Sequence, residues 1–124
     1  MSNFRCSMPR EALREIGDAA VRHLVETRIH ENNDVAGNAA NFLKVHHPDW
    51  RKSQGAAEAI PYLVKGLKND HCYTRRAAAQ VLGEMGWLAK AALPQLVLAM
   101  ADRNEAVRRA AKKAISETVL RRKK

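Results

Sequence analysis

The residues best suited to ligand chemistry in this sequence are paired basic side chains in its second half. Arg75-Arg76 recurs further along the chain as Arg108-Arg109, and Lys112-Lys113 comes one helical turn after the second pair. Guanidinium groups bind carboxylates and phosphates through charge-assisted hydrogen bonds that often form in parallel pairs. The candidate partner-binding residues are therefore Arg75, Arg76, Arg108, Arg109, Lys112 and Lys113.

The charge of the chain is unevenly distributed along the sequence. Its 124 residues include 22 Lys and Arg against 13 Asp and Glu, which gives a formal net charge of +9. Residues 51–124 hold 16 of the basic side chains and six of the acidic ones. This excess indicates an acidic partner, whether a protein surface, nucleic acid or anionic lipid, although cations on a solvated helical surface also serve solubility alone.

Other reactive residue types form no catalytic or metal-binding pattern. His46-His47 stand near Asp49, but adjacent histidines in a loop point in different directions, so we interpret them as solvated. Cys72 lies at an expected helix start, where a thiol ionises more easily, yet the spacing assigns it no catalytic partner. With Cys6 it makes neither a disulfide framework nor a four-cysteine zinc site. We predict no catalytic residue, no metal site and no cofactor, and hence no enzyme.

The elements that must position the basic pairs are helices arranged in repeats. Pro61-Tyr62-Leu63 is echoed by Pro94-Gln95-Leu96, at the same offset that separates the two arginine pairs. Each copy predicts a first helix, over residues 59–68 and 92–101, followed by a polar break and an Ala-rich second helix. In the second helices the apolar residues recur at helical spacing, which predicts one buried face for each.

A weaker copy of the same unit lies upstream. It predicts helices over residues 11–27 and 35–45, with the Asn32-Asn33-Asp34 turn supplying N-cap side chains for the second of them. Residues 46–55 have the polarity and turn residues of an ordered loop. The residues expected to face inward from the first helix are Leu13, Ile16, Ala20 and Leu24, with Val21 as a further candidate. Three helical hairpins and about six helices are therefore expected.

This pattern resembles the HEAT repeat, in particular the short bacterial type also found in phycobilisome lyase-like proteins. The matching segments are residues 59–67 (AIPYLVKGL), 75–86 (RRAAAQVLGEMG), 92–96 (ALPQL) and 102–111 (DRNEAVRRAA). The resemblance implies an all-α fold, an α-solenoid of about three HEAT-like helical hairpins in which each hairpin buries the apolar face of its neighbour. We expect a single HEAT-like domain over residues 1–124, with approximate units at 9–47, 56–87 and 88–120 and a basic tail at 121–124.

The resemblance also implies an ionic contact between adjacent repeats. The family has an Asp in the turn between the two helices and a Val-Arg pair early in the second helix, and this Asp and Arg can pair across repeats. Asp102 and Val107-Arg108 fit this pattern. In the middle unit Arg75 is kept, while Asn69 and Thr74 replace the Asp and the Val; in the first unit Ala36 stands where the Arg is expected.

The function implied by this architecture is binding. In HEAT-like stacks the second helices line the concave face, which places the basic pairs in a row with about 10 Å between helices. We predict a non-catalytic protein–protein interaction module, an adaptor or regulator, that binds an acidic or amphipathic partner segment through the repeat surface. The alternative is nucleic-acid binding through the basic C-terminal half. The sequence starts without the pattern of a secretory signal and has no apolar run long enough for a membrane span, so a cytoplasmic location is expected.

Overall fold

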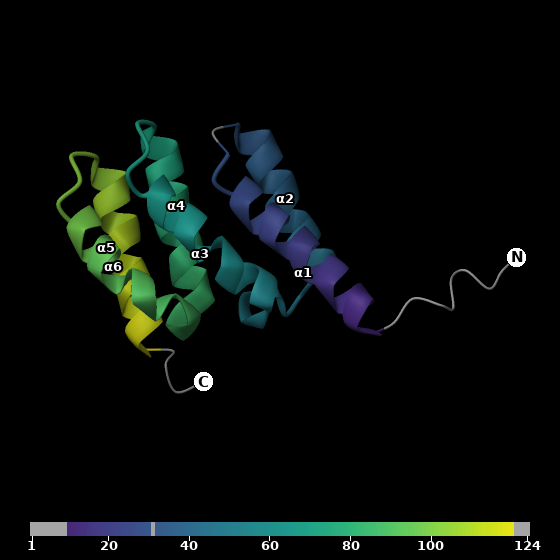
Figure 1. Cartoon of the computed structure of the whole chain (residues 1–124). Coiled ribbons are helices and arrows are strands. Elements are labelled where there is room, and N and C mark those ends of the chain that lie inside the picture. Colours follow the sequence, from purple (N-terminus) through teal and green to yellow (C-terminus); the bar gives the residue numbers. More distant parts are fainter. Residues whose placement is uncertain (1–9, 31, 121–124) are drawn as a thin grey trace, which may run out of the picture.

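The structure is a computed structural model that describes residues 10–30 and 32–120 (Figure 1). Over these residues the chain forms six α-helices and two 3-10 helices and contains no strand. The all-α arrangement predicted from the sequence is confirmed. In chain order the elements are α1 (Arg10–Thr27), α2 (Asn33–His46), η2 (Trp50–Lys52), α3 (Gln54–Gly66), α4 (Cys72–Met85), η3 (Gly86–Ala92), α5 (Leu93–Ala99) and α6 (Glu105–Leu120).

The same turn joins the two helices of each hairpin. His30 Nδ1 accepts a hydrogen bond from the backbone amide two residues later at 2.9 Å, and Asn69 and Asp102 accept the equivalent bond at 2.9 and 2.8 Å. The side chain of Asn32 then accepts from the amides two and three residues later and caps α2, as predicted, and Asn104 does the same for α6. The turns of the three hairpins α1–α2, α3–α4 and α5–α6 therefore share one hydrogen bond, and α2 and α6 also share the same side-chain cap.

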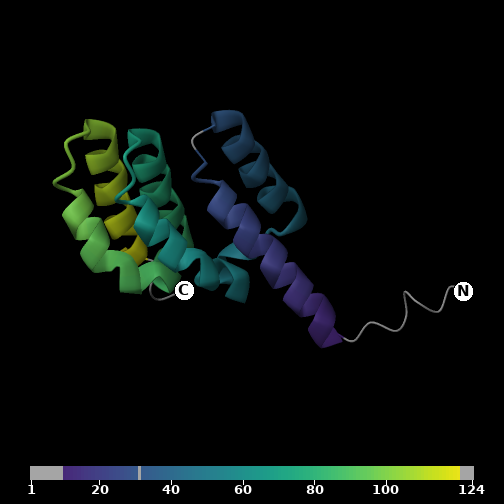
Figure 2. The same ribbon diagram turned by 45° about the horizontal axis from the view of Figure 1, so that its top comes forward.

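The hairpins lie in a row, but the two junctions between them differ. The first and second hairpins pack through their first helices, α1 against α3, whereas the second and third pack through their second helices, α4 against α6. Figure 2 shows α2 set apart from α4. The row of second helices expected from the sequence therefore runs side by side only from α4 to α6.

The apolar core continues through all three hairpins. The largest fully buried leucines come from successive helices: Leu43, Leu63, Leu82 and Leu96. Trp50 is 6% exposed, and the guanidinium groups of Arg28 and Arg51 lie 5.7 and 5.9 Å from its ring centroid. Residues 46–55 are therefore more than the polar loop expected from the sequence, because η2 places a large aromatic side chain in the core there.

The inward face of α1 differs from the prediction. Ile16 is 56% exposed and Ala20 is exposed, so the assignment of these two residues to the core is wrong; Leu24 packs against the core, and the side chain of Leu13 lies outside the described residues. The further candidate Val21 is buried, and Val25 is buried as well, followed by Ile29 just after the helix ends. Ile16 is exposed because the N-terminal half of α1 extends past the neighbouring helices (Figure 1), whereas Ala20 is exposed within the segment that crosses α3.

A buried ion pair joins the second and third hairpins. Arg75 Nε and Nη2 donate to the two carboxylate oxygens of Asp102 at 2.8 and 3.2 Å, and Arg75 Nη1 donates to the carbonyls of Asn69 and Asp70. The two charged side chains are only 8% and 11% exposed. This is the Arg–Asp contact between adjacent repeats that the resemblance implied, and Ala36 leaves the first hairpin without an equivalent arginine.

The ion pair predicts a pH dependence of stability. Burial acts to raise the pKa of Asp102, but the hydrogen bonds from the Asn104 amide and Arg75, together with the charges of Arg75 and Arg103, outweigh it and hold the pKa below its ordinary value. A carboxylate whose pKa is lowered by folding stabilises the protein above its unfolded pKa of about 3.9 and loses that contribution as the pH falls through the folded value. Asp102→Asn should therefore be less stable than wild type at pH 6. Denaturant unfolding should show that the difference in unfolding free energy between the two proteins becomes smaller below about pH 4. A difference in unfolding free energy that stays constant across this range would contradict the lowered pKa of Asp102.

Candidate functional site

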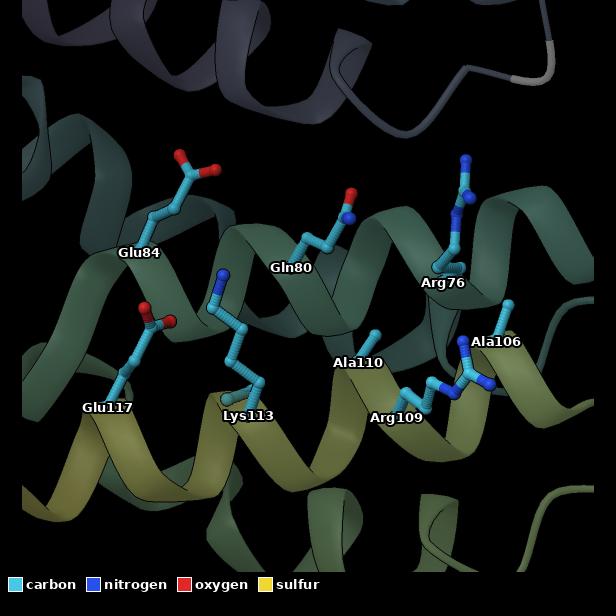
Figure 3. Close-up of a pocket in the computed structure, with 9 residues that line it drawn as sticks. Arg76, Gln80, Glu84, Ala106, Arg109, Ala110, Lys113 and Glu117 are labelled. Carbon is cyan, nitrogen blue, oxygen red and sulfur yellow. The ribbon is translucent and has the colours of Figure 1, made fainter.

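A groove of about 410 Å³ runs between α4 and α6, which lie side by side (Figure 3). Its lining residues recur every three or four positions, so each helix contributes a single face. They are Arg76, Gln80 and Glu84 from α4, and Ala106, Arg109, Ala110, Lys113, Ala114 and Glu117 from α6. This is the place where the structure brings basic residues from two repeats together.

Small residues shape the contact between the two helices. A Cβ atom placed on Gly83 would lie 2.8 Å from the Cα of Ala114, so the helices approach more closely than any larger residue at position 83 would allow. On α6 the groove also contains Ala106 and Ala110. The long polar side chains of the lining consequently surround Ala106 and Ala110, whose short side chains leave the groove open.

One end of the groove is basic. The Arg76 guanidinium lies 5.7 Å from the ring centroid of Tyr73 but makes no hydrogen bond or ion pair with any residue that the structure describes, and its Nε is buried without a partner. Arg109 Nη2 donates to Glu105 Oε2 at 2.8 Å, in an exposed pair that is worth little in water. Lys113 has no ionic partner within the described part of the chain. All three cations are thus available to a ligand.

The other end of the groove is acidic. Figure 3 shows Glu84 and Glu117 opposite the end that holds Arg76 and Arg109. Glu84 accepts two hydrogen bonds from Arg28, at 2.5 and 3.1 Å, and so ties the first hairpin to α4. Sequence reasoning missed this ion pair because its two members stand 56 residues apart. Because Arg28 neutralises Glu84, the positive charge of the groove falls along its length toward Glu117.

The structure divides the six candidate residues among three places. Arg76, Arg109 and Lys113 line the groove. Arg75 is buried in the ion pair with Asp102 and does not reach the groove. The remaining two, Arg108 and Lys112, lie on another face of α6, where Lys112 borders a separate hollow. The sequence pairs are thus split, because neighbouring residues on a helix point about 100° apart.

The described residues hold neither a cluster of metal ligands nor a helix that could span a membrane. No group of three His, Cys, Asp or Glu side chains gathers closely enough among them to hold a metal ion. The His46 ring lies 4.3 Å from that of Phe42, measured between centroids. No helix within residues 10–30 and 32–120 combines the length and the apolar character that crossing a membrane requires.

The comparison with known families agrees with the geometry. A family model described as HEAT repeats matches residues 21–116. No curated protein and no solved structure matches the chain. The matched segment begins within α1 and ends within α6, so it covers the second hairpin fully, the other two in part, and the groove lining except Glu117.

Proposed function

Because this chain belongs to the HEAT-repeat family, we propose that its groove binds an acidic segment of a partner protein. HEAT repeats commonly mediate protein–protein interaction and generally serve as non-enzymatic scaffolds. The observation that carries the proposal is the unpartnered Arg76 guanidinium, which stands with Arg109 at one end of the groove, while Lys113 lies between them and the two glutamates. The chain then acts as an adaptor or regulator rather than as a catalyst.

The change of charge along the groove supports a polypeptide ligand. A nucleic-acid strand carries a phosphate on every nucleotide, and beyond Lys113 it would meet the carboxylate of Glu117 beside the Arg28–Glu84 ion pair. A peptide can instead place its acidic side chains beside Arg76 and Arg109 and present neutral or basic ones to the other end. We therefore expect a segment whose acidic residues are clustered at one end.

Charge reversal in the groove tests this proposal. Arg76→Glu/Arg109→Glu is expected to weaken binding of a short, glutamate-rich amphipathic peptide about tenfold or more, because each charge-assisted hydrogen bond contributes about 1.5–3 kcal/mol. Fluorescence anisotropy of the labelled peptide measures the affinity. Circular dichroism should show the same helicity as wild type, because Arg109 is exposed and Arg76 holds no partner that the fold requires.

The matched control is Lys44→Glu/Lys68→Glu, which changes the net charge equally at two exposed lysines outside the groove. This control should bind the peptide almost as tightly as wild type. An equal loss in both variants would mean that net charge alone attracts the peptide, and the proposal would fail. Tighter binding of a duplex or single-stranded oligonucleotide than of the peptide, with a steep dependence on salt, would favour the nucleic-acid alternative instead.

A further inference from the structure

A hollow of about 530 Å³, which we call the edge hollow, lies where the hairpins are joined to one another. The two connections between hairpins form most of it, since η2 contributes Arg51 and Lys52 and η3 contributes Gly86, Trp87 and Leu88. The end of α4 completes the lining, and η2 contacts both α4 and η3. Two segments that are distant in the sequence thus build one surface.

The lining of the edge hollow is largely apolar. Met85 is buried, whereas Trp87 and Leu88 are 37% and 38% exposed. The helix α4 ends at Met85, and the following Gly86 has a φ of 62°, a conformation that glycine adopts readily. The two large side chains come directly after this turn. Adjacent exposed apolar side chains of this size indicate a binding surface, unlike apolar side chains that are exposed singly.

Cations surround this apolar lining. Lys90 Nζ lies 5.0 Å from the ring centroid of Trp87, and Arg51 and Lys52 border the edge hollow. None of the three cations has an ionic partner among the residues that the structure describes. Glu84, the carboxylate of the lining, is already paired with an arginine of the first hairpin. The edge hollow therefore favours an apolar group that has a negative charge beside it.

The edge hollow continues the groove, because Glu84 borders both of them. Figure 3 shows Glu84 and Arg76 at opposite ends of the groove, and α4 rises about 12 Å between these two residues. Spread over that length, the groove volume of about 410 Å³ gives a mean cross-section of about 35 Å², less than half of the area of a helix about 10 Å across. The groove therefore suits an extended chain, in which about 12 Å corresponds to about four residues.

We propose that the edge hollow binds an apolar side chain of the same partner segment, with a carboxylate next to it, about four residues from the acidic cluster held at the basic end of the groove. The apolar side chain packs on Trp87 and Leu88, and the carboxylate next to it faces Arg51 and Lys52. Opposite Glu117, between these two points, the segment carries no acidic residue. This inference rests on the function proposed for the groove and adds a second point of attachment to it.

Charge and shape favour this occupant over a second copy of the chain or a membrane. The chain has a formal net charge of +9, so a second copy would be repelled by the cations around the edge hollow. Binding to a membrane surface requires apolar side chains that project into it, whereas Trp87 and Leu88 line a hollow. A narrow segment that is both apolar and acidic meets both conditions.

The probe is a labelled peptide in which two glutamates are followed, after three uncharged residues, by leucine and glutamate. A matched peptide has serine in place of the leucine, and both are made in the two sequence directions. In the direction that binds more tightly, fluorescence anisotropy with the wild-type chain should show about tenfold tighter binding of the leucine peptide, because a buried leucine contributes about this factor. Moving the leucine next to the two glutamates should remove the gain, since it then cannot reach the edge hollow.

A substitution in the chain tests the same contact from the other side. Leu88→Glu should remove the difference between the leucine and serine peptides, because it places a charge where the leucine packs. The matched control is Leu98→Glu, which introduces the same charge at a 67% exposed leucine of α5 outside the edge hollow, and it should keep the tenfold difference. Circular dichroism checks that both variants are folded, and the peptide comparison with the wild-type chain does not depend on either variant.

Three results would overturn the proposal. The first is equal affinity of the leucine and serine peptides for the wild-type chain, and the second is an equal effect of Leu88→Glu and Leu98→Glu. The third is a dimer of the chain, or its sedimentation with phosphatidylserine vesicles, that Leu88→Glu abolishes, because a second copy or a membrane would then occupy the edge hollow. Failure of the groove proposal is recognised separately, since the serine peptide would then bind equally well to wild type and Arg76→Glu/Arg109→Glu.

Discussion

Replacing Asp102 by alanine is expected to lower the free energy of unfolding by about 3–5 kcal/mol. The substitution leaves the Arg75 guanidinium, 8% exposed, with two backbone carbonyls and no counter-charge. It also removes the carboxylate oxygen that accepts the Asn104 amide at the start of α6. Urea unfolding followed by circular dichroism measures the loss. Because the pair is the described ionic contact between the second and third hairpins, we expect the third hairpin to separate first.

The matched control for this prediction is Asp70→Ala. Asp70 is exposed, lies in the corresponding turn of the second hairpin and uses only its backbone carbonyl to bind Arg75. Its replacement should change stability by less than about 0.5 kcal/mol. If Asp102→Ala cost no more than Asp70→Ala, the buried pair would not hold the hairpins together. The double variant Arg75→Met/Asp102→Leu should recover part of the loss, because it removes the stranded charge as well.

Gly55→Ala is expected to have the second largest effect, a loss of about 3 kcal/mol or more. Gly55 is buried near the start of α3, where it crosses α1. A Cβ atom there would lie 2.2 Å from the backbone oxygen of Asp18 and 3.1 Å from the backbone nitrogen of Arg22. Both are main-chain atoms within α1, so no side-chain rotation relieves the clash and the helices must move apart. The thermal unfolding temperature, measured by calorimetry, should fall accordingly.

Gly37→Ala is the control for that prediction. Gly37 lies within α2 and has no atom within 4 Å of its would-be Cβ. Alanine is the better helix former, so this change should raise stability by about 0.5–1 kcal/mol. The two Gly→Ala substitutions are thus expected to have opposite signs. Similar effects from both would contradict the close crossing of α1 and α3.

Much of the fold could be predicted from the sequence because matching residues of the repeats recur at a constant offset. The offset that relates Arg75 to Arg108 set the register of the second and third hairpins, and the polar turn at Asp102 together with the retained Arg75 indicated their ionic contact. The first hairpin was harder to predict. Its longer connection contains Trp50, and the polar residues around that tryptophan gave no sign that it enters the core.

The candidate site was predictable only in its residue types. The sequence indicated that paired cations recur, but adjacent residues of a pair face different neighbours, and which one is buried depends on how the next hairpin docks. Arg75 is buried and Arg76 is available because the third hairpin covers one stripe of α4 and leaves the next open. The contribution of Arg28, which pairs with Glu84, could not be inferred because it depends on how the first hairpin packs on the second.

The most direct test of the central claim is a nuclear magnetic resonance titration of the isotope-labelled full chain with the glutamate-rich peptide. The account predicts saturable shifts of the Nε–Hε signal of Arg76 and of the backbone amides of Gln80, Arg109 and Lys113. Signals of the exposed Lys44 and Lys68 should stay in place. Shifts spread over all exposed basic residues without saturation, with Arg76 unmoved, would contradict the account.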